Sequence, residues 1–151
     1  MTNFVDAIKQ QMHGYTIKKM ESMQGHDGLA WRATFCKDGK EVVTAYDDGW
    51  GGPVALTVHD KELYAGFVAK AKELEPEGFE VEGALAGMIA DAAENLKAIT
   101  RKAKSAVLVQ LVGDTQDEYR VVKMLPTLEN IHKVKAHYGD KLQCVINEQL
   151  G

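Results

Sequence analysis

The chain has 151 residues, of which 45% are hydrophobic and 26% charged, and its formal net charge at pH 7 is −4. This composition excludes an intrinsically disordered chain, and the length is enough to bury a sizeable core. Basic and acidic residues are spread along the whole chain without a basic arm, so nucleic acid is not an expected partner. The sequence shows no run of 18 apolar residues and no signal-peptide pattern, so we expect a cytoplasmic protein without a membrane segment.

The two cysteines, Cys36 and Cys144, lie far apart in the sequence and show no CxxC spacing. This arrangement is typical of reduced, buried thiols and not of a disulfide framework or a zinc site. No other pattern of metal or cofactor ligands stands out. The sequence therefore predicts a protein that folds and works without a cofactor.

The first elements are a short helix and a strand. Residues 3–12 place apolar side chains at helical spacing, and Thr2 or Asn3 is a suitable N-cap. Residues 15–24 are predicted to form a strand.

A β-hairpin is predicted around the dipeptide Asp38-Gly39, which separates two alternating runs at residues 29–37 and 40–47. The dipeptide is a strong hairpin signal, because glycine accepts the positive φ of a type I′ turn. Counting back from a two-residue loop places Trp31 opposite Tyr46 on the face that we expect to be buried. The predicted pairs on this face are Phe35–Val42, Ala33–Thr44 and Trp31–Tyr46.

The remaining segments predict an α+β fold. They are a strand at 53–59, a helix from 61 to about 74 capped by Asp60, a helix at about 80–103, strands at 106–112 and 119–125, a helix between Thr127 and Gly139, and a strand at 141–147. Strands and helices do not alternate strictly, which favours an N-terminal antiparallel β-meander with a central hairpin, two helices and a C-terminal ββαβ unit. One domain over residues 1–151 is expected, with a division into 1–75 and 79–151 at the EPEG segment as the alternative.

Two glycine-rich stretches, GHDG at 25–28 and DDGWGG at 47–52, are expected to meet at the open end of the hairpin. The same register places Arg32 diagonally across from Asp47, within reach of an ion pair. The candidate binding residues are Trp50, Asp48, Asp47, His26, Asp27 and Arg32.

Three interpretations of this cluster remain open at the level of sequence. Aspartate and glycine are ordinary turn residues, and aspartate side chains often close turns by accepting from backbone N–H groups. An exposed Trp50 could anchor a protein partner. The histidine and carboxylates could instead bind a divalent cation such as Mg²⁺, Mn²⁺ or Ca²⁺, although their spacing matches no known metal motif.

Residues 23–52 resemble a group of small proteins from phages and bacterial mobile elements. The shared pattern is a G-[HRK]-[DE]-G turn, an alternating strand, DGK, and an acid-rich turn with paired glycines, present here as GHDG, DGK and DDGWGG. The resemblance covers these residues alone and implies no known activity. It favours a phage accessory protein, and such proteins often act by binding a host protein; for a phage-encoded chain the expected location is the host cytoplasm.

Two functional hypotheses follow. The first is a non-catalytic phage-type accessory protein that binds and modulates or inhibits a host or defence-system protein, in keeping with the lack of recognisable catalytic motifs in the sequence. The second is a small metal- or phosphate-ligand-binding enzyme that uses the cluster of His26, Asp27, Asp47 and Asp48.

Overall fold

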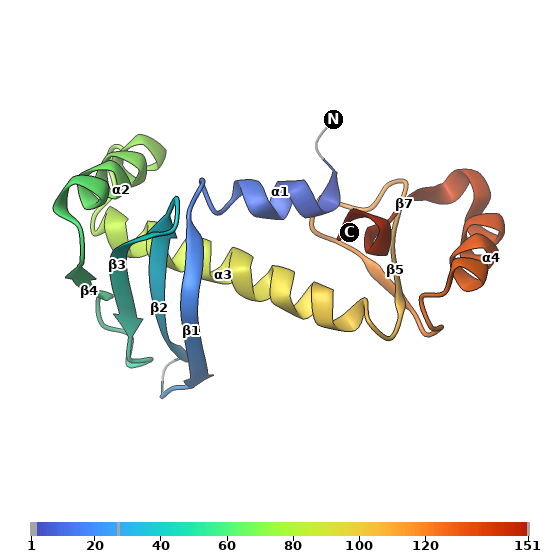
Figure 1. Ribbon diagram of the computed structural model, residues 1–151, viewed down its shortest axis with the longest axis horizontal. Helices are drawn as coiled ribbons and strands as arrows, with labels where there is room; N and C mark the ends of the chain where they lie inside the picture. The colour runs from blue at the N-terminus through green and yellow to red at the C-terminus, as the bar shows by residue number, and fades with distance from the viewer. Residues whose placement is uncertain (1–2, 27, 151) are drawn as a thin grey trace. The chain divides into compact units, whose positions relative to one another are not determined.

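The computed structural model describes residues 3–26 and 28–150 (Figure 1). Its elements are α1 (Phe4–Gln10), β1 (Thr16–Gln24), β2 (Leu29–Lys37), β3 (Lys40–Asp47), β4 (Ala55–Val58), α2 (Lys61–Leu74), α3 (Val81–Lys102), β5 (Val107–Leu111), β6 (Arg120–Val122), α4 (Leu128–Tyr138), the short 3-10 helix η1 (Gly139–Lys141), β7 (Leu142–Val145) and the 3-10 helix η2 (Ile146–Gln149). The fold is α+β, with the predicted N-terminal meander, two helices and C-terminal ββαβ unit. None of the helices in the described ranges is long and apolar enough to cross a membrane.

The chain forms two compact units. One is continuous, Gln11–Ala93, and the other combines Met1–Gln10 with Glu94–Gly151. The EPEG segment at 75–78 lies inside the continuous unit, where it links α2 to α3. The expectation of one folding domain over residues 1–151 stays a prediction.

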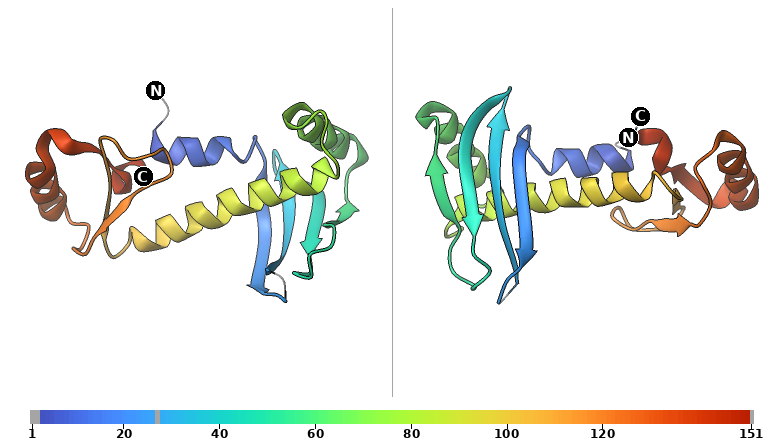
Figure 2. Two further views of the ribbon diagram at one scale, coloured as in Figure 1. Left: turned by 180° about the vertical axis from the view of Figure 1, so that it is seen from behind. Right: turned by 60° about the horizontal axis from the view of Figure 1, so that its bottom comes forward.

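The continuous unit is built on an antiparallel sheet in the order β1-β2-β3-β4, with α2 and α3 on one of its faces (Figure 2). Phe35 of β2 and Phe67 of α2 are fully buried, and their ring centroids lie 6.2 Å apart. The residues of α3 in this core are Val81, Leu85, Ala86, Ile89 and Ala90. The helix α2 starts where the sequence predicts, because the Asp60 carboxylate accepts a hydrogen bond of 3.0 Å from the backbone N–H of Leu63.

The opposite face of this sheet, here called the outer face, carries mainly polar side chains. Successive side chains of a strand point to opposite faces, so the cross-strand pairs decide which residues share it. Arg32 pairs with Tyr46 and with Glu21, and Thr34 pairs with Thr44 and with Lys19. Within the described part of the continuous unit, both helices lie on the other side of the sheet.

The predicted hairpin forms, but its register changes after two pairs. Asp38 and Gly39 both have positive φ, 50° and 82°, as a type I′ turn requires. Lys37–Lys40 and Cys36–Glu41 pair as a two-residue loop at Asp38-Gly39 requires, and the register then shifts between Phe35 and Cys36. The observed pairs beyond this point are Phe35–Val43, Thr34–Thr44, Ala33–Ala45, Arg32–Tyr46 and Trp31–Asp47.

The shift is a β-bulge at Val42. Val42 and Val43 are consecutive and both fully buried, which strict alternation on a one-sided sheet does not allow. The carbonyl of Val42 accepts hydrogen bonds from the backbone N–H groups of His59 and Asp60, at 2.9 and 3.3 Å. The extra residue therefore connects β3 to the segment that starts α2.

The bulge makes the prediction for Trp31 and Tyr46 wrong. The two residues lie on opposite faces, because Trp31 pairs with Asp47 while Tyr46 pairs with Arg32. Trp31 packs against the core and is partly buried, whereas Tyr46 lies on the outer face and is 48% exposed.

The discontinuous unit contains a three-stranded antiparallel sheet in the order β6-β5-β7. Its fully or nearly fully buried side chains include Val107, Val109, Val134 and Val145. The side chain of Asn147 binds three backbone groups: it donates to the carbonyls of Ala103 and Ala106, and it accepts from the N–H of Leu108. Thr127 caps α4 as predicted, with its hydroxyl accepting from the N–H of Asn130 at 3.1 Å.

Both cysteines are free thiols, but they differ in burial. Cys36 on β2 is buried, as expected. Cys144 on β7 is only partly buried, which corrects the prediction for this residue. Burial raises the pKa of the Cys144 thiol above its ordinary value.

Candidate functional site at the open end of the hairpin

The two glycine-rich stretches meet through their backbones, as the hairpin geometry predicts. The N–H of Gly25 donates to the carbonyl of Gly28 at 2.6 Å. A Cβ atom placed on Gly25 would lie 2.8 Å from the Cα of Gly49, and one placed on Gly49 would lie 2.9 Å from the Cα of Gly25. Side chains larger than hydrogen do not fit at either position without a backbone shift.

Asp47 and Asp48 each close a turn in this loop. The Asp47 carboxylate accepts from the N–H of Gly49, and the Asp48 carboxylate accepts from the N–H of Trp50, both at 2.9 Å. This is the aspartate turn chemistry that the sequence indicated as one interpretation. One oxygen of each carboxylate is therefore already committed to the backbone.

The side chain of Trp50 is exposed to solvent and stacks on the ring of His26. Its side chain is 63% exposed, as the sequence led us to expect. The indole and imidazole rings are stacked, with centroids 4.5 Å apart and an interplanar angle of 16°. The stack contacts the side chain of Trp50, and the Asp48 turn holds its backbone.

Further exposed apolar side chains lie at the same end of the sheet. Met23 ends β1, Leu29 starts β2 and Tyr46 lies near the end of β3, with exposed fractions of 69%, 47% and 48%. Leu29 shares the face of Trp31, whereas Met23 and Tyr46 lie on the outer face. Met23, Tyr46 and Trp50 are here called the open-end patch. Large apolar side chains gathered in this way are typical of an interaction surface.

Two predicted site residues do not join the cluster as expected. The ion pair between Arg32 and Asp47 does not form, because the bulge places the two side chains on opposite faces of the sheet. Asp27 lies outside the described residues. Among the residues that the structure describes, no group of three histidine, cysteine or acidic side chains is arranged to hold a metal ion.

The outer face holds a row of hydrogen-bonded polar side chains that could not be recognised from the sequence. The hydroxyls of Thr34 and Thr44 are 2.8 Å apart, and the Thr44 hydroxyl lies 2.7 Å from Nε2 of His59. Thr44 is buried, although it is polar. The signal in the sequence is weak, because these three residues come from different strands and from the loop after β4.

An ion pair between Lys18 and Glu41 lies in the same depression as Thr34, Thr44 and His59. The ammonium of Lys18 and the carboxylate of Glu41 are 2.9 Å apart. Their hydrogen bond raises the pKa of Lys18 and lowers the pKa of Glu41. Both groups are exposed to solvent, so the pair fixes local geometry and adds little stability.

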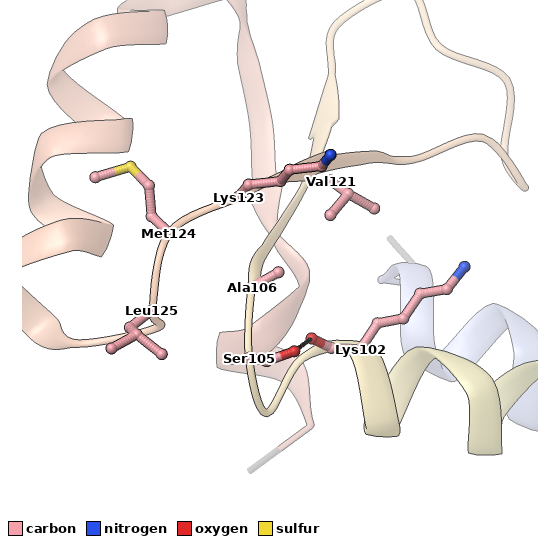
Figure 3. Close-up of a pocket in the computed structure, with 7 residues that line it drawn as sticks. All are labelled: Lys102, Ser105, Ala106, Val121, Lys123, Met124 and Leu125. Atoms are coloured by element: carbon pink, nitrogen blue, oxygen red, sulfur yellow. Dashed lines mark hydrogen bonds between the residues drawn. The ribbon is translucent and has the colours of Figure 1, made fainter.

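The discontinuous unit has a separate open pocket of about 480 Å³ beside β6 (Figure 3). Lys102 and Lys123 line it together with Ser105 and apolar side chains. The ammonium of Lys102 donates a hydrogen bond of 2.9 Å to the hydroxyl of Tyr119. Lys123 and Met124 extend in opposite directions from the segment after β6 (Figure 3). The described lining contains no acidic or histidine side chain.

Comparison with known proteins gives no relative from which a function could be transferred. No protein-family model, curated protein or solved structure matches the chain.

Proposed function

We propose that the chain is a non-catalytic accessory protein of the phage type, which binds a host or defence-system protein through the open-end patch and modulates or inhibits it. The observation that carries the proposal is Trp50, a large apolar side chain that is 63% exposed and yet fixed by its stack on His26. Binding to a preorganised side chain loses little conformational entropy, and tryptophan is enriched at the energetic centre of interfaces.

The geometry favours binding over catalysis at this cluster. Asp47 and Asp48 hold backbone N–H groups and are not directed together at a common point. His26 is stacked on Trp50 and forms no described hydrogen bond to a carboxylate or hydroxyl that could act as a nucleophile. The cluster therefore resembles a rigid contact loop more than a cation site or an acid–base centre.

The proposal is tested by comparing Trp50→Ala with Phe79→Ala. Phe79 is a matched control, because it is an aromatic side chain of the same unit that is 89% exposed and outside the open-end patch. The purified chain and both variants are used to capture proteins from a bacterial lysate. A captured protein is then purified and its affinity for each variant is measured.

We expect Trp50→Ala to weaken binding of the purified partner by about 30-fold, corresponding to about 2 kcal/mol for the loss of an anchor residue. Phe79→Ala should bind as the unchanged chain does. The unfolding free energy of Trp50→Ala should stay within about 0.5 kcal/mol of the parent, as for an exposed position. Equal binding by both variants would contradict Trp50 as the anchor. A sharp loss of stability in Trp50→Ala would show that its role is structural.

A further inference from the structure

The outer face of the β1–β4 sheet has two adjoining depressions of different chemistry. One is apolar, with a volume of about 330 Å³, and its lining includes Met23, Ala30 and Tyr46. The other is polar, with a volume of about 360 Å³, and contains the Thr34–Thr44–His59 chain. Glu21 and Arg32 line both depressions. A single small ligand that extends across Arg32 can therefore occupy both depressions.

The polar depression has an excess of positive charge. Lys18 and Glu41 form an ion pair and compensate each other. Lys19 and Arg32 remain against the single carboxylate of Glu21, which leaves a formal charge of +1 with His59 neutral. A planar guanidinium and an ammonium on one small surface are the usual protein partners of a phosphate group.

The hydroxyl chain can supply a further donor to an anion. Its two hydrogen bonds are made by the Thr34 and Thr44 hydroxyls and Nε2 of His59. When Nε2 carries a proton, His59 donates to Thr44 and Thr44 donates to Thr34, so the hydroxyl proton of Thr34 is left over. An anion in the depression favours this direction of the chain, because it gains the Thr34 hydroxyl as a donor.

The apolar depression begins beside the phosphate donors. Arg32 and Tyr46 are directly paired across β2 and β3 and therefore lie next to each other on the outer face. Tyr46 is 48% exposed, so much of its side chain is accessible to a ligand. A flat ring can pack against an accessible aromatic or methionine side chain.

We propose that the outer face binds a small phosphate monoester that carries a flat ring, which is the chemistry of a nucleoside monophosphate. The phosphate group contacts Lys19, Arg32 and the Thr34 hydroxyl, and the ring packs against Tyr46 and Met23. The phosphate donors lie apart from the Trp50–His26 stack, whereas Met23 and Tyr46 also belong to the open-end patch. A bound small molecule and the protein partner proposed above therefore share these two side chains.

Isothermal titration calorimetry on the full chain tests the proposal. The probes are the 5′-monophosphates of adenosine, guanosine, cytidine and uridine, the four matching nucleosides, and inorganic phosphate. We expect at least one monophosphate to bind at least about tenfold more tightly than its nucleoside and than inorganic phosphate, because only it uses both depressions. No binding of any monophosphate, or equal binding of nucleoside and monophosphate, overturns the proposal.

Variants locate the ligand on the outer face. Arg32→Gln and Thr34→Val should each lower the affinity for the monophosphate by about tenfold. Thr34→Ser keeps the hydroxyl and should bind the monophosphate as the parent does. Thr57→Val is the matched control, since Thr57 lies on β4 beside Thr44 but lines neither depression. Circular dichroism confirms that each variant is folded. Unchanged binding in both folded Arg32→Gln and folded Thr34→Val overturns the assignment.

Discussion

Replacing Gly25 with alanine tests how closely the two glycine-rich stretches approach each other. The added Cβ would lie 2.7 Å from the carbonyl oxygen of Gly28 and 2.8 Å from the Cα of Gly49. Ordinary contacts of a Cβ atom are 3.4–4 Å, and both neighbours are backbone atoms that cannot rotate away. We expect Gly25→Ala to lower the free energy of unfolding by about 1–3 kcal/mol, the usual cost of overpacking.

Gly52→Ala is the matched control in the same region. A Cβ at Gly52 meets no described atom within 4 Å, and its φ lies outside the positive range. This change should be neutral or stabilise by about 0.4–1 kcal/mol, because alanine restricts the unfolded chain. The two variants should therefore differ by about 1–4 kcal/mol, or about 0.5–2 M in urea midpoint for a slope of about 2 kcal/mol/M.

Urea unfolding followed by tryptophan fluorescence measures this difference. Both tryptophans, Trp31 and Trp50, belong to the continuous unit Gln11–Ala93, so the signal reports on the unit that contains the substitution. Equal midpoints for Gly25→Ala and Gly52→Ala would refute the close backbone approach and, with it, the rigid placement of the loop that carries Trp50.

Two further predictions concern the thiols and the pH dependence of stability. In the native protein, a thiol reagent should modify the partly exposed Cys144 before the buried Cys36; mass spectrometry of peptides would show the order, and faster labelling of Cys36 would contradict its burial. A hydrogen bond from Arg120, followed by one from the Leu111 N–H, holds the pKa of Asp114 below its ordinary value of 3.8. The ionised form therefore stabilises the fold above that value, and this contribution is lost as the pH falls through the lowered pKa. The difference in unfolding free energy between the parent and Asp114→Asn should be full near neutral pH and shrink below about pH 4; a difference that stays constant from pH 7 to pH 3 would argue against this pairing.

Features that depend on nearby residues could be predicted from the sequence. The caps by Asp60 and Thr127 are examples, because an N-cap is decided by a side chain and a backbone group three residues away. The turn at Asp38-Gly39 is another, because few residues other than glycine accept its φ. The overall α+β order followed from such local signals.

Features that depend on distant residues were missed. The bulge at Val42 depends on the burial of two adjacent valines and on hydrogen bonds from the start of α2, so counting pairs back from the turn could not show it. In the candidate site, the meeting of the glycine stretches followed from the hairpin. The stack of His26 on Trp50 and the contact of Thr44 with His59 did not, because each joins residues from separate loops or strands.

The two ends of the chain cooperate in building one unit, and this has a consequence for the order of folding during synthesis. The N–H of Val5 in α1 donates to the side chain of Gln149 at 3.0 Å, across 144 positions of sequence. The seven residues of α1 are too few to hold a helix in isolation. On the ribosome, the continuous segment Gln11–Ala93 can therefore complete its sheet and α2 early, whereas α1 is synthesised before this segment and finds Gln149 only after it. During that interval the apolar side chains of α1, such as Phe4 and Ile8, lack the partners that bury them in the folded unit.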